Sequence, residues 1–216
     1  MGFEGEAASR SRLIAFPQEK TMSETALREL LVHGMKDMHF AENAILKALP
    51  KMIEAALDEE LKDALTNHME ETAGHVERLE EGFQALKEKA EGTPCKAMQG
   101  ILSEGEEILG KFGKTDAGDA AIIFACQAVE HYEISRYGSM REWADELGLE
   151  DVAALLNETL DEEYAADDRL TAIATGGANE DAMEDEDDED EDDDEAEAGA
   201  EETGAKEAPS RKKTST

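Results

Sequence analysis

The sequence is poor in the residues that build disulfide-rich, aromatic-rich or membrane-spanning proteins. It holds two cysteines, four prolines and 5% aromatic residues in 216 positions. Cys95 and Cys126 lie far apart without a CxxC pair, so we expect free thiols and no disulfide framework or zinc site. No apolar run approaches the ~20 residues of a membrane-spanning helix. The abundance of Ala, Leu, Glu, Met and Lys instead predicts an all-α protein.

Basic residues are also scarce, with 21 Lys and Arg against 55 Asp and Glu, a net charge of −34. Residues 180–216 hold 18 acidic and 4 basic residues, a net charge of −14, which leaves −20 on residues 1–179. An acidic surface repels phosphate, so we expect neither nucleic acid nor membrane as a partner. Residues 1–21 contain no apolar run of signal-peptide length, which predicts a cytoplasmic location. The charge excess suggests a cytoplasm rich in salt, a halophilic setting.

The chain divides into three predicted parts. Residues 1–21 are polar and aperiodic and predict a disordered extension, with Met1 or Met22 as the true start. Residues 22–177 carry helical periodicity and form the predicted domain. Residues 178–216 contain an unbroken acidic run, cannot bury a core and are predicted to be disordered. We interpret this tail as a solvating segment, with binding of a protein partner as the alternative.

Apolar residues recur three and four positions apart in four long segments of the domain. They predict helices over residues 25–57, 59–89, 119–147 and 150–174, with a bend at Pro50 in the first. A shorter helical piece, residues 96–109, lies between the second and third and is interpreted as part of a crossover connection. Four long helices and a short crossover helix predict a four-helix bundle.

Each long segment also carries charged residues where its apolar stripe predicts the core. In the first segment, for example, Met38, Glu42, Ile45 and Leu49 are spaced four, three and four apart, which places Glu42 on the buried side. Glu158 and Glu163 are placed at the margins of the last stripe. The polar residues predicted to face the core are Glu42 in the first segment, His68, Glu71 and His75 in the second, Glu130 and Glu133 in the third, and Glu162 in the last.

Several carboxylates facing one another in a low-dielectric core are unfavourable unless cations neutralise them, and two divalent ions would do so. Oxygen and imidazole ligands favour iron, with manganese or zinc as alternatives, whereas calcium prefers more oxygens. Ferritin-like bundles use one Glu from each of two helices and Glu-x-x-His from the other two. The match is partial, because His68 precedes Glu71 and no His lies near Glu162. A ligand role for His75 competes with a role as a polar flank, and His131 is a candidate outer residue.

Five segments together resemble the YciE/YciF family of ferritin-like proteins, which is associated with bacterial and archaeal stress responses. The resemblance covers about residues 25–174 and leaves both flanking tails outside. Its motifs are DMHFAENAILKALPKM (37–52), HMEETAGHVERLEEGF (68–83), CKAMQGILSEGEEIL (95–109), AVEHYEISRYG (128–138) and LNETLDEEYAADDRLTAIA (156–174).

This resemblance implies a ferritin-like bundle, a di-metal site, a homodimer and no firmly assigned reaction. The YciE/YciF family is also similar to rubrerythrin-like proteins, in which two Glu residues three apart on one helix contribute to the metal site. Glu130 and Glu133 would do so here. The chain lacks the rubredoxin-like cysteine module that would supply electrons. The metal-site candidates carried over by the resemblance are Glu42, His68, Glu71, Glu130, Glu133 and Glu162.

Two functional hypotheses follow. In the first, the protein is a di-metal stress-response protein, an oxidoreductase in which two iron or manganese ions bridged by Glu71 and Glu162 react with peroxide or dioxygen. In the second, it is a non-enzymatic structural or partner-binding stress protein with a vestigial metal site, whose carboxylates are protonated or paired with Arg78, Arg136 or Arg169. Iron storage is less favoured, because nothing in the sequence indicates a shell-forming assembly. Catalytic residues are not identified.

Overall fold

The structure is a computed structural model that describes residues 22–183. The predicted extension 1–21 and residues 184–216 of the predicted tail lie outside the described residues. Within residues 22–183 the chain is all-helical, which confirms the predicted class. Its elements are α1 (Met22–Ala55), α2 (Glu59–Leu86), α3 (Lys96–Phe112), α4 (Gly118–Glu146), α5 (Glu150–Ile173), the short π-helix η1 (Ala174–Ala178) and α6 (Asn179–Asp181).

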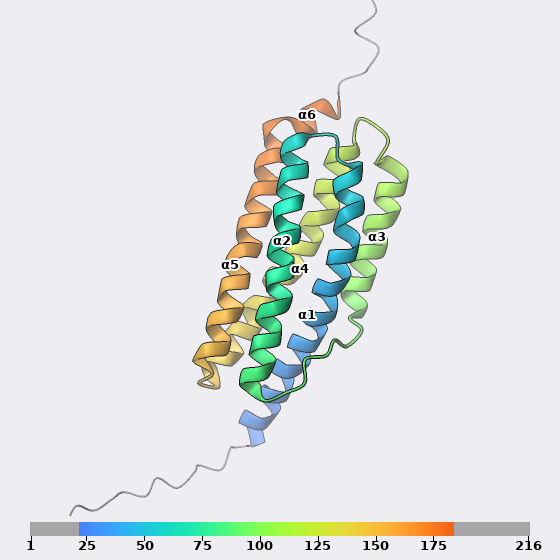
Figure 1. The fold of residues 1–216 in the computed structure, drawn as a ribbon. Helices are drawn as coiled ribbons and strands as arrows, with labels where there is room; N and C mark the ends of the chain where they lie inside the picture. The colour runs from blue at the N-terminus through green and yellow to red at the C-terminus, as the bar shows by residue number, and fades with distance from the viewer. Residues whose placement is uncertain (1–21, 184–216) are drawn as a thin grey trace, which may run out of the picture. The chain divides into compact units, whose positions relative to one another are not determined.

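Helices α1, α2, α4 and α5 form the bundle, and each packs against two of the others (Figure 1). Around the bundle their order is α1, α2, α5, α4. The shorter α3 lies outside this ring against α4 and α1, and it carries the chain back along the bundle before α4 begins (Figure 1). As a result α2 and α4 run in the same direction. The predicted four-helix bundle with a short crossover helix is confirmed.

Hydrogen bonds join the turn between α1 and α2 to the start of α4. Helix α1 continues through Pro50 to Ala55. The Asp58 side chain caps α2 by accepting a hydrogen bond from the Leu61 N–H at 2.7 Å. The two carboxylate oxygens of Asp119, in the first turn of α4, accept the N–H groups of Leu57 and Asp58, each at 2.8 Å. These contacts fix the ends of the two helical hairpins against each other.

The connection between α2 and α3 crosses the surface of α1. The Thr93 N–H donates to the carbonyl oxygen of Lys36 at 3.0 Å. A Cβ atom on Gly92 would lie 3.0 Å from the Phe40 backbone, a distance that only glycine tolerates without a shift of the chain. This close approach docks the crossover on α1 and places α3 over the junction of α1 and α4.

The core is built mainly from Leu, Ile, Met and Ala, and Tyr137 and Phe83 are among its largest fully buried side chains. Cys95 and Cys126 are both buried and free, as predicted. No helix within residues 22–183 combines the length and apolar character that crossing a membrane requires.

The acidic charge of the domain predicts a dependence of stability on salt. Residues 1–179 carry a net charge of −20, and their mutual repulsion opposes folding in dilute buffer. Screening shortens to ~3 Å at about 1 M ionic strength. We expect a chain truncated after residue 183 to melt higher in about 1 M KCl, by roughly 2–4 °C for each kcal/mol of repulsion removed. Circular dichroism melts measure this, and a melting temperature independent of KCl would contradict the halophilic interpretation.

Candidate metal centre

The four bundle helices bury polar side chains at one level of the core. Each of these side chains is at least nine-tenths buried, although charged groups are rarely buried without a partner. Two threonines, Thr72 and Thr159, accompany them. The buried charged and imidazole residues are Glu42 on α1, His68 and His75 on α2, Glu130 and Glu133 on α4, and Glu163 on α5.

Helical spacing explains why these residues converge. On α2, His68, Thr72 and His75 are four and three residues apart and therefore lie on one face. On α4, Glu130 and Glu133 are three apart and share a face in the same way. Because the four helices pack around one core, their polar positions meet at its centre.

The polar atoms fall into two groups, and in each group the ligand atoms lie within 4.8 Å of one another. The first group is His68, Glu130, Glu133 and Glu163, and His68 Nε2 lies 3.3 Å from Glu130 Oε1. The second group is Glu42, His75 and Glu163. In it, His75 Nδ1 lies 3.0 Å from Glu163 Oε1 and 3.5 Å from Glu42 Oε2. Glu163 belongs to both groups.

Many of these atoms have no hydrogen-bond partner. Leaving a buried polar atom unpaired costs on the order of 1–3 kcal/mol, so a concentration of such atoms calls for a ligand. Within the described residues, the unpartnered atoms at this centre are Glu42 Oε2, His68 Nδ1 and Nε2, His75 Nδ1, Glu130 Oε2, both carboxylate oxygens of Glu133 and both of Glu163.

Burial and mutual repulsion raise the pKa values of the α4 carboxyls. For Glu130, burial is the largest cause, followed by the charge of Glu163, and together they hold its pKa well above the usual range. Burial and the charges of Glu163, Glu42 and Glu130 do the same for the pKa of Glu133. Without a cation, these two side chains favour the protonated state.

His75 and Glu163 behave as an ion pair in the absence of a cation. Burial by itself would lower the pKa of His75, but the neighbouring Glu163 and Glu42 outweigh it and raise this pKa to about 10. For Glu163 the signs are opposite: burial by itself would raise its pKa, but its interactions with His75 and Glu130 lower it. A divalent ion at this position would take over the role of the imidazolium charge.

Three further residues hold the second group in place. The Tyr137 hydroxyl donates to Glu42 Oε1, and the pKa of this tyrosine is raised by burial and by the charge of Glu42, so it remains a donor. His75 Nε2 lies 3.0 Å from Glu162 Oε2. Glu162 is in turn bound by the Arg78 guanidinium. These contacts leave Glu42 Oε2 and His75 Nδ1 directed toward Glu163.

The structure brings together four of the six residues predicted from the sequence, Glu42, His68, Glu130 and Glu133, all of them buried. The predicted inward position of Glu162 is wrong. Its side chain is 31% exposed, and Glu163, predicted at the margin, is fully buried. The core face of α5 runs through Leu156, Thr159, Leu160, Ala166 and Leu170, and Glu163 lies on this face while Glu162 lies at its edge.

Glu71 also lies at the edge of the centre and not inside it. Its side chain is 26% exposed, and its Oε2 is 3.9 Å from His68 Nδ1. Oε1 accepts a hydrogen bond from Asn67 at 2.6 Å. Thr72 occupies the inward position beside it, with His75 one turn further on. The sequence pattern also places His75 on this face. Because His75 is interpreted there as a polar flank, the predicted ligand set does not include it.

This chain is similar in sequence to known proteins. Residues 26–183 match the family described as a domain of unknown function, DUF892. Protein YciF of Escherichia coli (strain K12) is 36% identical over 162 residues, which make up 74% of this chain and 98% of YciF.

Two solved structures share the fold. The crystal structure of the E. coli stress protein YciF is 37% identical with a TM-score of 0.68, covering 71% of this chain and 97% of YciF. The structure of YcfI from Rhodopseudomonas palustris, described as a protein with a proposed structural role, is 44% identical with a TM-score of 0.67. That match covers 68% of this chain and 94% of YcfI.

Proposed function

The chain belongs to the DUF892 family, and on that premise we propose that its helical domain is a YciF-like stress-response protein holding two divalent metal ions. The resemblance to the YciE/YciF family is confirmed by the similarity to YciF over most of both chains. The observation that carries the metal proposal is the set of unpartnered carboxylate and imidazole atoms in two groups that share Glu163.

Charge supports two divalent ions. The two groups contain four carboxylates, Glu42, Glu130, Glu133 and Glu163, and two imidazoles. Two divalent cations balance four carboxylates when both histidines are neutral. A neutral cluster avoids most of the cost of burying like charges. Mixed oxygen and nitrogen ligands favour iron, with manganese or zinc as alternatives.

In this proposal His68, Glu130 and Glu133 would hold one ion, Glu42 and His75 would hold the other, and Glu163 would contribute to both. His75 would bind through Nδ1 while its Nε2–H donates to Glu162, the arrangement in which an outer carboxylate fixes the tautomer and orientation of a metal-bound imidazole. Glu162 and Glu71 thereby become outer residues that orient the ligands.

Such a pair of ions, when bound, supplies electrophilic and redox chemistry toward a small oxidant such as dioxygen or peroxide. The protein's own residues supply the geometry and a dry site. His68, His75 and the four carboxylates are at least nine-tenths buried, so bulk water is kept from the centre. Tyr137 holds one oxygen of Glu42 and so fixes the direction of the other.

Metal analysis tests the proposal directly. After anaerobic reconstitution with Fe(II) or Mn(II) and removal of excess metal, we expect about two ions per chain, as in ferritin-like di-metal bundles. The variant Glu158→Gln should bind the same amount, because the Glu158 side chain is 62% exposed and belongs to neither group. Fewer than one transition-metal ion per chain would overturn the proposal.

A second candidate function is a structural stress protein without a working metal site. It is favoured by the structural role proposed for YcfI and by the Arg78 guanidinium, which pairs with Glu162 and Glu158. Such a protein would carry protonated Glu130 and Glu133. Its melting temperature would not respond to Fe(II), Mn(II) or Zn(II), whereas a di-metal protein is stabilised by the ions that bind its folded state.

The predicted homodimer and cytoplasmic location belong to this proposal. A homodimer would also set the protein apart from an iron-storage shell. Size-exclusion chromatography with light scattering distinguishes a dimer from a large assembly.

A further inference from the structure

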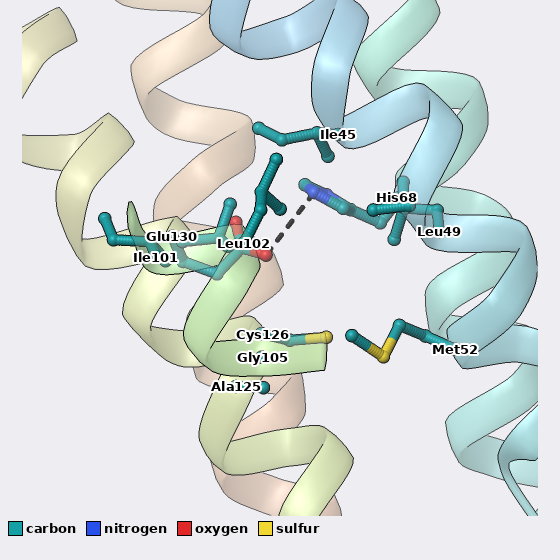
Figure 2. A pocket seen from close by; sticks show the side chains of 12 residues that line it. Ile45, Leu49, Met52, His68, Ile101, Leu102, Gly105, Ala125, Cys126 and Glu130 are labelled. Carbon is teal, nitrogen blue, oxygen red and sulfur yellow. Dashed lines mark ion pairs between the residues drawn. The ribbon is translucent and has the colours of Figure 1, made fainter. Parts of the chain in front are cut away.

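A small cavity lies between α1, α3 and α4 and ends at the candidate metal centre (Figure 2). Its volume is about 30 Å³. Of its twelve lining residues, ten are aliphatic, sulfur-containing or glycine, and the two others are His68 and Glu130. Figure 2 shows the His68 ring and the Glu130 carboxylate facing each other at one end of this cavity, with Leu102 of α3 beside them.

The cavity has room for a diatomic molecule and not for an organic substrate. A water molecule needs about 10–15 Å³ of such volume, so the cavity of about 30 Å³ admits a molecule of about two heavy atoms. A buried water needs two to four polar partners, and here they are confined to the end where a metal ion would bind. Burial raises the pKa of the Cys126 thiol to about 12, so this side chain also stays uncharged.

The polar end of the cavity points to a ligand. His68 and Glu130 are 6% and 2% exposed, and neither ring nitrogen of His68 nor Oε2 of Glu130 has a hydrogen-bond partner. A molecule in the cavity would therefore lie directly beside the ion held by these two side chains.

We propose that this cavity is the access and docking site through which dioxygen reaches the metal ion at His68 and Glu130. The inference rests on the proposed di-metal function and narrows its oxidant to dioxygen. Hydrogen peroxide carries two O–H groups that would lose their hydrogen bonds along an apolar wall, whereas dioxygen loses none. In this arrangement the crossover helix α3 forms one wall of the oxidant site as well as connecting the two hairpins.

Gly105 of α3 provides the means to block the cavity. A Cβ atom there would lie 3.5 Å from Ala125 Cβ and 3.7 Å from Met52 Cε, which are ordinary contacts. Alanine is therefore accommodated, while the longer side chain of Gly105→Leu would project into the cavity. A Cβ atom on Gly100, in the same helix, would have no neighbour within 4 Å, so Gly100→Leu adds the same side chain to open space.

The first experiment needs no metal. The full chain, methyl-labelled and metal-free, is placed under dioxygen pressure, and the paramagnetic relaxation of its methyl groups is measured by NMR. We expect enhanced relaxation at Ile45 and Leu49 relative to Leu31 and Leu61, because all four are buried but only the first two line the cavity. Gly100→Leu should keep this enhancement and Gly105→Leu should lose it. Equal relaxation of the two sets in the unaltered protein would overturn the proposal.

The second experiment uses protein loaded with Fe(II) and follows its oxidation by dioxygen. Gly105→Leu should slow oxidation by about tenfold, equivalent to about 1.4 kcal/mol of additional barrier, at unchanged metal content. Gly100→Leu should match the unaltered protein.

An unchanged rate in a folded Gly105→Leu protein would refute the access route while leaving the metal site in place. If Gly105→Leu does not fold, the methyl relaxation measured in the unaltered protein and in Gly105→Ala still tests whether dioxygen enters the cavity. A chain that binds no metal refutes the proposed function, and the dioxygen relaxation data then report on the cavity alone.

Discussion

Replacing Glu163 with glutamine should abolish the binding of both metal ions, because this carboxylate belongs to both groups of candidate ligands. Glutamine keeps the size and shape of the side chain but removes its charge and one of its two acceptor oxygens. We expect the affinity for Fe(II) or Mn(II) to fall by more than the about 10–100-fold that loss of an outer partner costs. Isothermal titration under anaerobic conditions and metal analysis after desalting measure the loss.

Neighbouring residues on α5 supply the controls for this substitution. Glu162→Gln should weaken binding by about 10–100-fold through the orientation of His75, and Glu158→Gln should leave it unchanged. All three substitutions remove one carboxylate charge from the same helix, so any general effect of charge is shared. If Glu162→Gln abolished binding and Glu163→Gln did not, the ligand set predicted from the sequence would be the correct one.

The fold is predictable because its signals are long and repeated. Four segments with apolar residues three and four apart, separated by turn residues, identify the bundle helices to within a few residues of their observed ends. The short piece between the second and third helices is correctly interpreted as a crossover, since it is too short to span the bundle.

The candidate site is predicted less completely, because a stripe of apolar residues fixes the rotation of a helix only to about one position. On α5 both Leu155 and Leu156 fit an apolar stripe. A stripe through Leu155 leads to Glu162, whereas Leu156 and Leu160, which are buried, lead to Glu163 three residues later. Giving weight to the pair Leu156 and Leu160 would find the buried carboxylate.

The cavity beside the centre has no counterpart in the sequence pattern. Its lining residues come from four helices, α1 to α4, and Gly105 and Ala125 matter only because α3 packs against α4 at that point. Small residues at such positions are common for packing reasons alone. The relation between α3 and the metal centre depends on the path of the crossover over α1, which no periodicity encodes.

Replacing Glu133 with glutamine should stabilise the metal-free protein and remove its response to metal. Glu133 is fully buried with both oxygens unpartnered, and its pKa is raised well above the usual range by burial and by Glu163, Glu42 and Glu130. A carboxyl whose pKa is raised on folding favours the folded state below its ordinary pKa of 4.5 and loses that contribution as the pH rises through the raised value. The metal-free protein should therefore lose stability as the pH rises above about 4.5 and through this raised pKa, and Glu133→Gln should lose less of it.

The expected difference is large enough to measure by calorimetry in the presence of a chelator. Glutamine avoids the cost of protonating this carboxyl on folding, which is about 1.4 kcal/mol for each unit by which the pH exceeds 4.5, up to the raised pKa. In a domain of this size that raises the melting temperature by roughly 2–4 °C for each kcal/mol. Glu104→Gln, which removes the same charge from an exposed position, should change the melting temperature little. With metal at about 100 times the dissociation constant, the unaltered protein should gain about 2.7 kcal/mol of stability that Glu133→Gln does not gain. The difference in melting temperature between the two proteins should then shrink or change sign. A variant that melts below the unaltered protein in chelator near neutral pH would show that the Glu133 carboxylate is stabilised by something other than a metal ion.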